Sequence, residues 1–387
     1  MTEETSKKKL EQTYAIALKN VTNNKYSFDK LTKTQYDHTS YIVSKSESQK
    51  AIVTALITSL VKKMDAPAQD IRQHKTELVG GYSARSFDTK IITPFLKQYF
   101  GRIAMKESGW LTRSIEQAHS FNLTFPGKIR DETLKNSFLK ILEDIEEKGG
   151  NPRNYLLVLF EQLILQKLSF EKSQNTMITS SKQINSEIVI SKIINLLEYH
   201  FFTKYSVGGA SRLPVIAIYS IYEIMMKDVK KYENKKLKEL KDHTTSDIKA
   251  KELGDIEILD NENNFFESIE IKHNIAATPD MITDIQTKIK EKTIHRYYLL
   301  TTAIPNIEVD SEKKVIQLVS QVKETHGCEI IVNGVMNSIK YYLRLIQNPQ
   351  EFIEKYTVNL LKDFEKNTDV KQVHIDLWNT LLQTLKK

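Results

Sequence analysis

The chain has 387 residues, of which 40% are hydrophobic and 27% are charged, and its formal net charge is +7 at pH 7. These values fit a soluble globular protein of about two domains, and the basic balance suits a polyanionic partner such as nucleic acid. The single cysteine, Cys328, excludes an intramolecular disulfide and indicates a reducing compartment. No segment resembles a signal peptide or reaches the length of a membrane span, so we expect a cytoplasmic protein without a membrane partner.

Residues 1–206 are predicted to form a mostly helical N-terminal region. Apolar residues recur at helical spacing within residues 46–64, which indicates a core helix. Asn151 followed by Pro152 predicts a helix start, because asparagine caps a helix and proline fits its first turn. Residues 173–186 are polar, and we expect them to form a loop after that helix.

Two turns, at residues 80–85 and 208–212, combine a glycine pair with serine and arginine side chains. Glycine permits close backbone approach to a ligand, and serine, tyrosine and arginine bind phosphates or base edges. An ordinary helix-start turn explains the first of them equally well. The candidate DNA-binding residues in these turns, and in the tryptophan-containing segment that follows the first, are Tyr82, Ser83, Arg85, Arg113 and Arg212.

Residues 207–387 are predicted to form a second domain with an α/β fold. Pro214 is predicted to begin a helix that extends to about residue 240. After a polar linker, alternating polar and apolar residues predict a β-hairpin over residues 254–272. A helix over residues 279–292 and a buried strand come next, followed by a further helix and a further strand. This order predicts a mixed sheet with right-handed helical crossovers, flanked by helices.

The predicted hairpin places two carboxylates next to each other. If Asp260 and Phe265, which flank its Asn-rich loop, are paired, Asp255 lies directly opposite Glu270, with Cβ atoms about 5 Å apart. Glu257 and Lys272 share their face, while isoleucines point to the other face.

Opposed like charges destabilise a strand pair, whereas a divalent cation would make the same arrangement favourable. Mg²⁺ is commonly held by one or two carboxylates and substrate phosphate oxygens, and it can polarise a phosphodiester and activate a water. Lys272 can then orient that water or stabilise charge on the phosphate. The group predicts a Mg²⁺-dependent phosphodiesterase site; the alternative is an amphipathic hairpin whose charged face is merely solvated.

Asp255, fourteen intervening residues, and then Glu270 and Lys272 in a Glu-Ile-Lys sequence resemble the signature of the PD-(D/E)XK nuclease superfamily. The flanking residues resemble type II restriction endonucleases in particular, although Gly254 stands where the family often has proline. The resemblance implies a restriction-endonuclease-like core, a mixed sheet flanked by helices. It implies further that Asp255, Glu270 and Lys272 are catalytic and that the two acids bind Mg²⁺. It also implies that a preceding helix sometimes supplies a further acid; Glu223 is the candidate metal ligand, its alternative being a partner for a nearby lysine.

The resemblance implies an enzyme that hydrolyses phosphodiester bonds in double-stranded DNA at a short, palindromic sequence. A palindrome is matched by a two-fold symmetric homodimer, and a cognate DNA methyltransferase would protect the host genome. Two alternatives remain: a nuclease of the same superfamily in DNA repair or mobile-element processing, and a noncatalytic DNA-binding or helical scaffold protein. The sequence has no Walker motif and no paired cysteines, which favours a stand-alone endonuclease.

Overall fold

The computed structural model describes residues 3–105, 115, 118–184, 188–240, 252–366 and 369–385. Contacts within the chain divide it into two compact units, Met1–Ser173 and Gln174–Lys387. The boundary falls within helix α7 (Pro152–Lys182), so the second unit begins before the predicted domain boundary at residue 206. Helix α8 (Ile190–Phe202) therefore belongs to the second unit.

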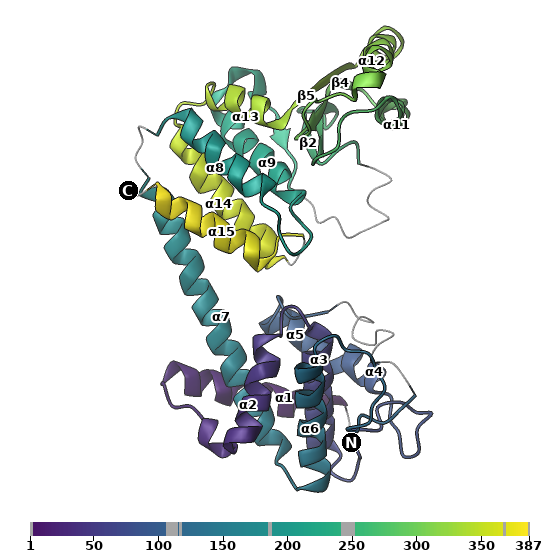
Figure 1. Ribbon diagram of the computed structural model, residues 1–387, viewed down its shortest axis with the longest axis vertical. Helices are drawn as coiled ribbons and strands as arrows, with labels where there is room; N and C mark the ends of the chain where they lie inside the picture. Colours follow the sequence, from purple (N-terminus) through teal and green to yellow (C-terminus); the bar gives the residue numbers. More distant parts are fainter. Residues whose placement is uncertain are drawn as a thin grey trace. The chain divides into compact units, whose positions relative to one another are not determined.

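The first unit is helical, and no strand is found among its described residues (Figure 1). The predicted core helix is present as α3, and the predicted helix start at Asn151 and Pro152 is the start of α7. Short 3₁₀ and π turns are labelled η. The elements before α7 are α1 (Glu3–Thr22), η1 (Phe28–Lys30), α2 (Lys33–Ser44), α3 (Lys50–Asp65), α4 (Ala84–Phe87), η2 (Asp88–Ile92), α5 (Thr93–Tyr99) and α6 (Glu132–Glu147).

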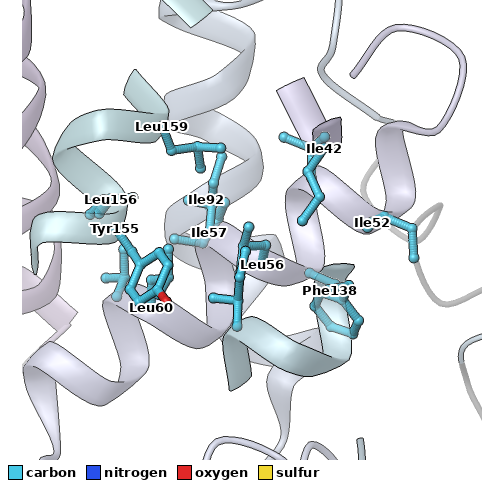
Figure 2. Packing of buried hydrophobic residues seen from close by; sticks show 14 of the residues in the cluster. Ile42, Ile52, Leu56, Ile57, Leu60, Ile92, Phe138, Tyr155, Leu156 and Leu159 are labelled. Atoms are coloured by element: carbon cyan, nitrogen blue, oxygen red, sulfur yellow. The ribbon is translucent and has the colours of Figure 1, made fainter. Parts of the chain in front are cut away.

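Helix α3 contributes much of the hydrophobic core of the first unit. Every residue from Ile52 to Val61 is buried, because apolar or small side chains occupy all faces of this part of the helix. Figure 2 shows the core side chains, and those labelled are Ile42, Ile52, Leu56, Ile57, Leu60, Ile92, Phe138, Tyr155, Leu156 and Leu159. Each large apolar side chain buried in this way contributes about 1.5–3 kcal/mol. The first unit therefore has its own core.

The loop predicted at residues 173–186 is wrong for most of its length, because α7 continues to Lys182. The segment is polar, but it contains no glycine or proline that would end a helix. Met177 and Ser181 are also buried there, at 1% and 0% exposure. Tertiary packing of these side chains therefore maintains the helix despite its polar composition.

The second unit combines helices with a five-stranded mixed sheet. None of the helices in the described part of the chain is both long and apolar enough to cross a membrane. After α7 and α8, its elements are α9 (Arg212–Asp228), η3 (Lys230–Tyr232), β1 (Lys236–Leu237), β2 (Ile256–Leu259), β3 (Phe265–Lys272), α11 (Pro279–Ile289), β4 (Ile294–Thr301), η4 (Val309–Ser311), α12 (Glu312–His326), β5 (Glu329–Gly334), α13 (Val335–Leu343), α14 (Pro349–Glu365) and α15 (Gln372–Thr384).

The sheet has the strand order β1-β2-β3-β4-β5. β1, β2 and β3 are antiparallel neighbours, whereas β3, β4 and β5 are parallel and are joined by α11 and α12. The predicted mixed sheet is therefore present. Helix α9 ends at Asp228 and not near residue 240, because the following segment leaves the helix at Val229 and pairs with β2, Lys236 opposite Leu259.

The two faces of the sheet are covered by different helices (Figure 1). Tyr297 and Leu299 of β4 pack with Ile285 of α11 and Val315 of α12 in one buried cluster. Because Glu270 is the neighbour of Leu299 in the parallel pair β3–β4, its side chain emerges on this same face. The carboxylates of the hairpin therefore lie on the side of the sheet that α11 and α12 cover.

The hairpin has the predicted register beside the charged residues and a different one near its turn. Ile256 is opposite Ile269, and continuing this pairing by one residue places Asp255 opposite Glu270. The register shifts between Ile258 and Leu259, so the predicted pair at the turn does not form. Asp260 instead accepts hydrogen bonds at 2.9 Å from the backbone N–H groups of residues 262 and 264, which closes the turn locally.

His200 of α8 is fully buried in the helical part of the second unit. Its Nε2 lies 2.9 Å from the carbonyl oxygen of His374, which can only accept, so Nε2 carries the proton and Nδ1 accepts from the Tyr356 hydroxyl at 2.9 Å. Burial lowers the pKa of His200 to about 3. The neutral ring is therefore part of the folded core.

We expect the protein to lose stability as the pH falls below about 6.5, the pKa of an unfolded histidine. The pKa of His200 is lower in the folded state, so at acidic pH the unfolded state binds more protons. The stability that the neutral, buried ring contributes is therefore fully present above pH 6.5 and is lost as the pH falls toward about 3. The pH slope of the free energy of unfolding, measured by urea denaturation between pH 5 and pH 7.5, should be smaller for His200→Gln by up to about 1.4 kcal/mol per pH unit. An unchanged slope would contradict this assignment.

Candidate active site

A pocket of about 450 Å³ lies where β3 ends and the chain approaches β2. It is bounded by the start of α9, the residues that directly precede β2, the end of β3, and α11. The predicted catalytic residues Asp255, Glu270 and Lys272 all line it. The other residues of its wall are Ser211, Val215, Glu252, Gly254, Ile271 and Lys288. The structure thus brings the three predicted side chains to one cavity.

Asp255 is positioned by the backbone of β3. Its Oδ2 accepts a hydrogen bond at 2.8 Å from the N–H of Ile271, the residue after Glu270. A Cβ atom added at Gly254 would lie 2.7 Å from both the carbonyl oxygen of Ile269 and Oγ of Ser268, so a side chain there would collide with β3. The glycine at this position therefore allows the close approach that places Asp255 beside Glu270.

Glu270 is held by cations from two elements. Nζ of Lys272 lies 2.6 Å from its Oε1, and Nζ of Lys288, on α11, lies 3.6 Å from its Oε2. The side chain of Glu270 is 16% exposed, so these ion pairs are partly shielded from water. The two lysines together offset the negative charge of this carboxylate.

Tyr297 of β4 is a buried neighbour of the site that does not appear in the sequence motif. Its hydroxyl donates to the carbonyl oxygen of Leu253 and lies 3.5 Å from Oε2 of Glu270. Burial, together with the charges of Glu270 and Asp255, raises the pKa of Tyr297 well above its ordinary value. The hydroxyl therefore remains a donor at neutral pH and fixes the backbone of Leu253, two residues before Asp255.

Glu257, the third acid of the predicted charged face, does not line the pocket. It is 4% exposed, forms an ion pair with Lys238, and accepts a hydrogen bond at 2.8 Å from the N–H of Leu253. Through these contacts, Glu257 fastens the hairpin to the residue that follows β1 and to the segment that precedes β2. Glu257 therefore has a structural role.

Glu223, the candidate additional metal ligand, also lies away from the pocket lining. Its carboxylate accepts from Nδ2 of Asn359 and lies 4.0 Å from Nζ of Lys355, both on α14. This arrangement corresponds to the alternative weighed for Glu223, that of a partner for a nearby lysine. Its role as a metal ligand stays a prediction that these contacts do not support.

The candidate DNA-binding residues have different environments. Tyr82 and Arg212 are buried, at 8% and 2% exposure, and Arg212 forms an ion pair with Asp363 at 2.9 Å. A buried guanidinium that is bound to a buried carboxylate supports the fold, and Tyr82 packs in the core of the first unit, so neither side chain is exposed as a DNA contact requires. Ser83 accepts from the N–H of residue 86 and caps α4, and Arg85 is exposed on that helix. Arg113 lies outside the described residues.

The pocket offers the oxygen ligands that a magnesium ion requires. Within the described residues, no group of three or more His, Cys, Asp or Glu side chains is arranged to hold a metal. Mg²⁺, however, commonly uses only one or two carboxylates and takes its other ligands from water and phosphate oxygens. Asp255 and Glu270, which line one pocket, fit that donor set.

Comparison with protein-family models finds none that matches this chain, and comparison with curated proteins finds no sequence match. Fold and pocket together define an α/β protein with a mixed sheet and a pocket of carboxylates and lysines.

Proposed function

We propose that the protein is a Mg²⁺-dependent endonuclease of the PD-(D/E)XK superfamily that cleaves double-stranded DNA, as a type II restriction endonuclease does. The observation that carries this proposal is the pocket at the end of β3, which Asp255, Glu270 and Lys272 line together. The surrounding order of elements, α9 followed by three antiparallel strands, α11 and the parallel strand β4, supports it, because the resemblance implies a mixed sheet flanked by helices.

The chemistry of the pocket suits phosphodiester hydrolysis. Asp255 and Glu270 would hold the metal, and a bound Mg²⁺ supplies the Lewis acid that polarises the phosphodiester. Lys272, released from Glu270, donates to a phosphate oxygen or orients the attacking water. The N–H of Ile271 holds the Asp255 carboxylate, and the Tyr297 hydroxyl fixes the backbone of Leu253, two residues before Asp255. Each residue thus has a role that its own contacts support.

The proposal extends to the partners of the enzyme. A short palindromic target would be bound by a homodimer with one active site on each strand. A cognate DNA methyltransferase would protect the same sequence in the host. We also propose that the first unit, which carries Arg85 on an exposed helix surface, contributes to DNA contacts or to the dimer.

Digestion of unmethylated phage or plasmid DNA tests this function. Purified protein should give discrete fragments with Mg²⁺ and intact DNA with EDTA, because removal of the metal leaves the carboxylates without the Lewis acid. Sequencing of the fragment ends would give the recognition site. A smear would indicate a nonspecific nuclease, whereas intact DNA across a range of metal and salt concentrations would favour a noncatalytic DNA-binding or scaffold protein.

A further inference from the structure

Lys288 shares Glu270 with Lys272 although the two lysines come from different elements. Lys272 ends β3, while Lys288 lies in the last turn of α11, and each contacts one oxygen of the same carboxylate. Ile285 and Ile289 anchor this part of α11 in the buried cluster next to β4. The backbone of Lys288 is therefore held by core packing, while its ammonium group points into the pocket.

The charge of Lys288 determines whether the metal-loaded pocket is neutral or positive. Among the described residues that line it, three are carboxylates, Glu252, Asp255 and Glu270, and two are lysines. With all five groups ionised, the pocket has a net charge of about −1, and a bound divalent cation changes this to about +1. Without Lys288 the metal-loaded pocket would be neutral. Lys288 thus supplies the excess positive charge that a phosphodiester anion requires.

Lys288 is also the more accessible of the two lysines. Its side chain is 41% exposed, compared with 31% for Lys272. Its separation of 3.6 Å from Glu270 is also longer than the 2.6 Å of the Lys272 pair. A weaker and more exposed ion pair exchanges more readily for a phosphate contact.

We propose that Lys288 is a phosphate-binding residue of this pocket, which contacts the DNA backbone when a metal occupies Asp255 and Glu270. The inference rests on the proposed function and adds a residue that the sequence motif does not contain. Its role is in binding, because a lysine that contacts a phosphate contributes a counterion-dependent share of DNA affinity. Lys272 keeps its proposed role in the chemical step, in which it orients the water or stabilises charge on the phosphate.

The test uses a short duplex that spans the cleavage site mapped with the wild-type protein. Its affinity is measured with Ca²⁺ in place of Mg²⁺, between about 50 and 200 mM salt, the range over which phosphate contacts dominate the salt effect. Lys288→Ala should lower the slope of log affinity against log salt by about 0.9, the value for one phosphate contact. Lys288→Arg should restore the slope, and Lys290→Ala, an exposed lysine of the same segment, should retain it.

Kinetics and folding controls complete the test. Lys288→Ala should raise KM severalfold in Mg²⁺ while kcat stays within about twofold, because uniform binding is lost and the chemistry is retained. Its thermal unfolding midpoint should equal that of Lys290→Ala. A wild-type salt slope and KM for Lys288→Ala would overturn this inference and leave the nuclease proposal intact. Absence of metal-dependent cleavage by the wild-type protein would overturn both.

Discussion

Replacing Lys272 with methionine is expected to reduce the rate of DNA cleavage by about 100-fold or more, the range for loss of a positioned acid–base or electrostatic group. Methionine preserves much of the aliphatic length of the side chain but removes its charge. The fold should be unaffected, because Lys272 is partly exposed and Glu270 keeps its contact with Lys288. Single-turnover cleavage of linear DNA in saturating Mg²⁺ measures the effect.

The matched control for Lys272→Met is Lys290→Met. Lys290 follows α11 and is exposed, and it does not line the pocket. Its variant should cleave at the wild-type rate. If Lys272→Met cleaves within about twofold of the wild type while both variants unfold at the same temperature, the assignment of Lys272 to the chemical step fails.

Arg212→Ala is expected to lower the free energy of unfolding by about 3–5 kcal/mol, as when one partner of a buried ion pair is removed. Arg212 and Asp363 have side-chain exposures of 2% and 4%, so the substitution leaves a buried carboxylate without this guanidinium. Urea denaturation measures the loss. Arg344→Ala removes an exposed arginine that lies over the ring of Tyr341, and it should cost about 1 kcal/mol or less.

A second substitution separates a structural from a DNA-binding role for Arg212. Adding Asp363→Asn to Arg212→Ala removes the buried carboxylate charge that has lost its Arg212 partner, and it should recover part of the lost stability. If Arg212→Ala instead keeps wild-type stability and lowers DNA affinity, the DNA contact predicted from the Gly-Gly turn is correct and the structural assignment is wrong.

The hairpin could be predicted from the sequence because its information is local. Alternation of side chains assigns faces, and the aliphatic residues specify the register, since a slip of one residue would move Ile256 and Ile269 to the charged side. The pairing of Asp260 with Phe265 failed because the Asp260 side chain closes the turn and shifts the register there. The shift is confined to the turn end, so the pairing beside the pocket was still correct.

The remaining parts of the site depend on contacts between distant segments. Lys288 and Tyr297 lie near Glu270 only because α11 and β4 fold back onto β3. The spacing of residues in the sequence does not predict these tertiary contacts. Glu223 was placed near the metal by its position in the preceding helix, but its partners come from α14, far along the chain. Arg212 was predicted to contact DNA from its place in a Gly-Gly turn, while its partner Asp363 is equally remote in sequence.

The carboxylates of this pocket are proposed to bind the metal that supports DNA cleavage. The most direct measurement is the digestion described above, carried out at increasing Mg²⁺ with the wild type, Glu270→Gln and Glu262→Gln. Glu262 lies exposed in the turn of the same hairpin, so its substitution is chemically identical but removed from the pocket. We predict saturable Mg²⁺-dependent cleavage for the wild type and Glu262→Gln, and loss of cleavage for Glu270→Gln. Equal cleavage by all three proteins, or cleavage by none, would contradict the account.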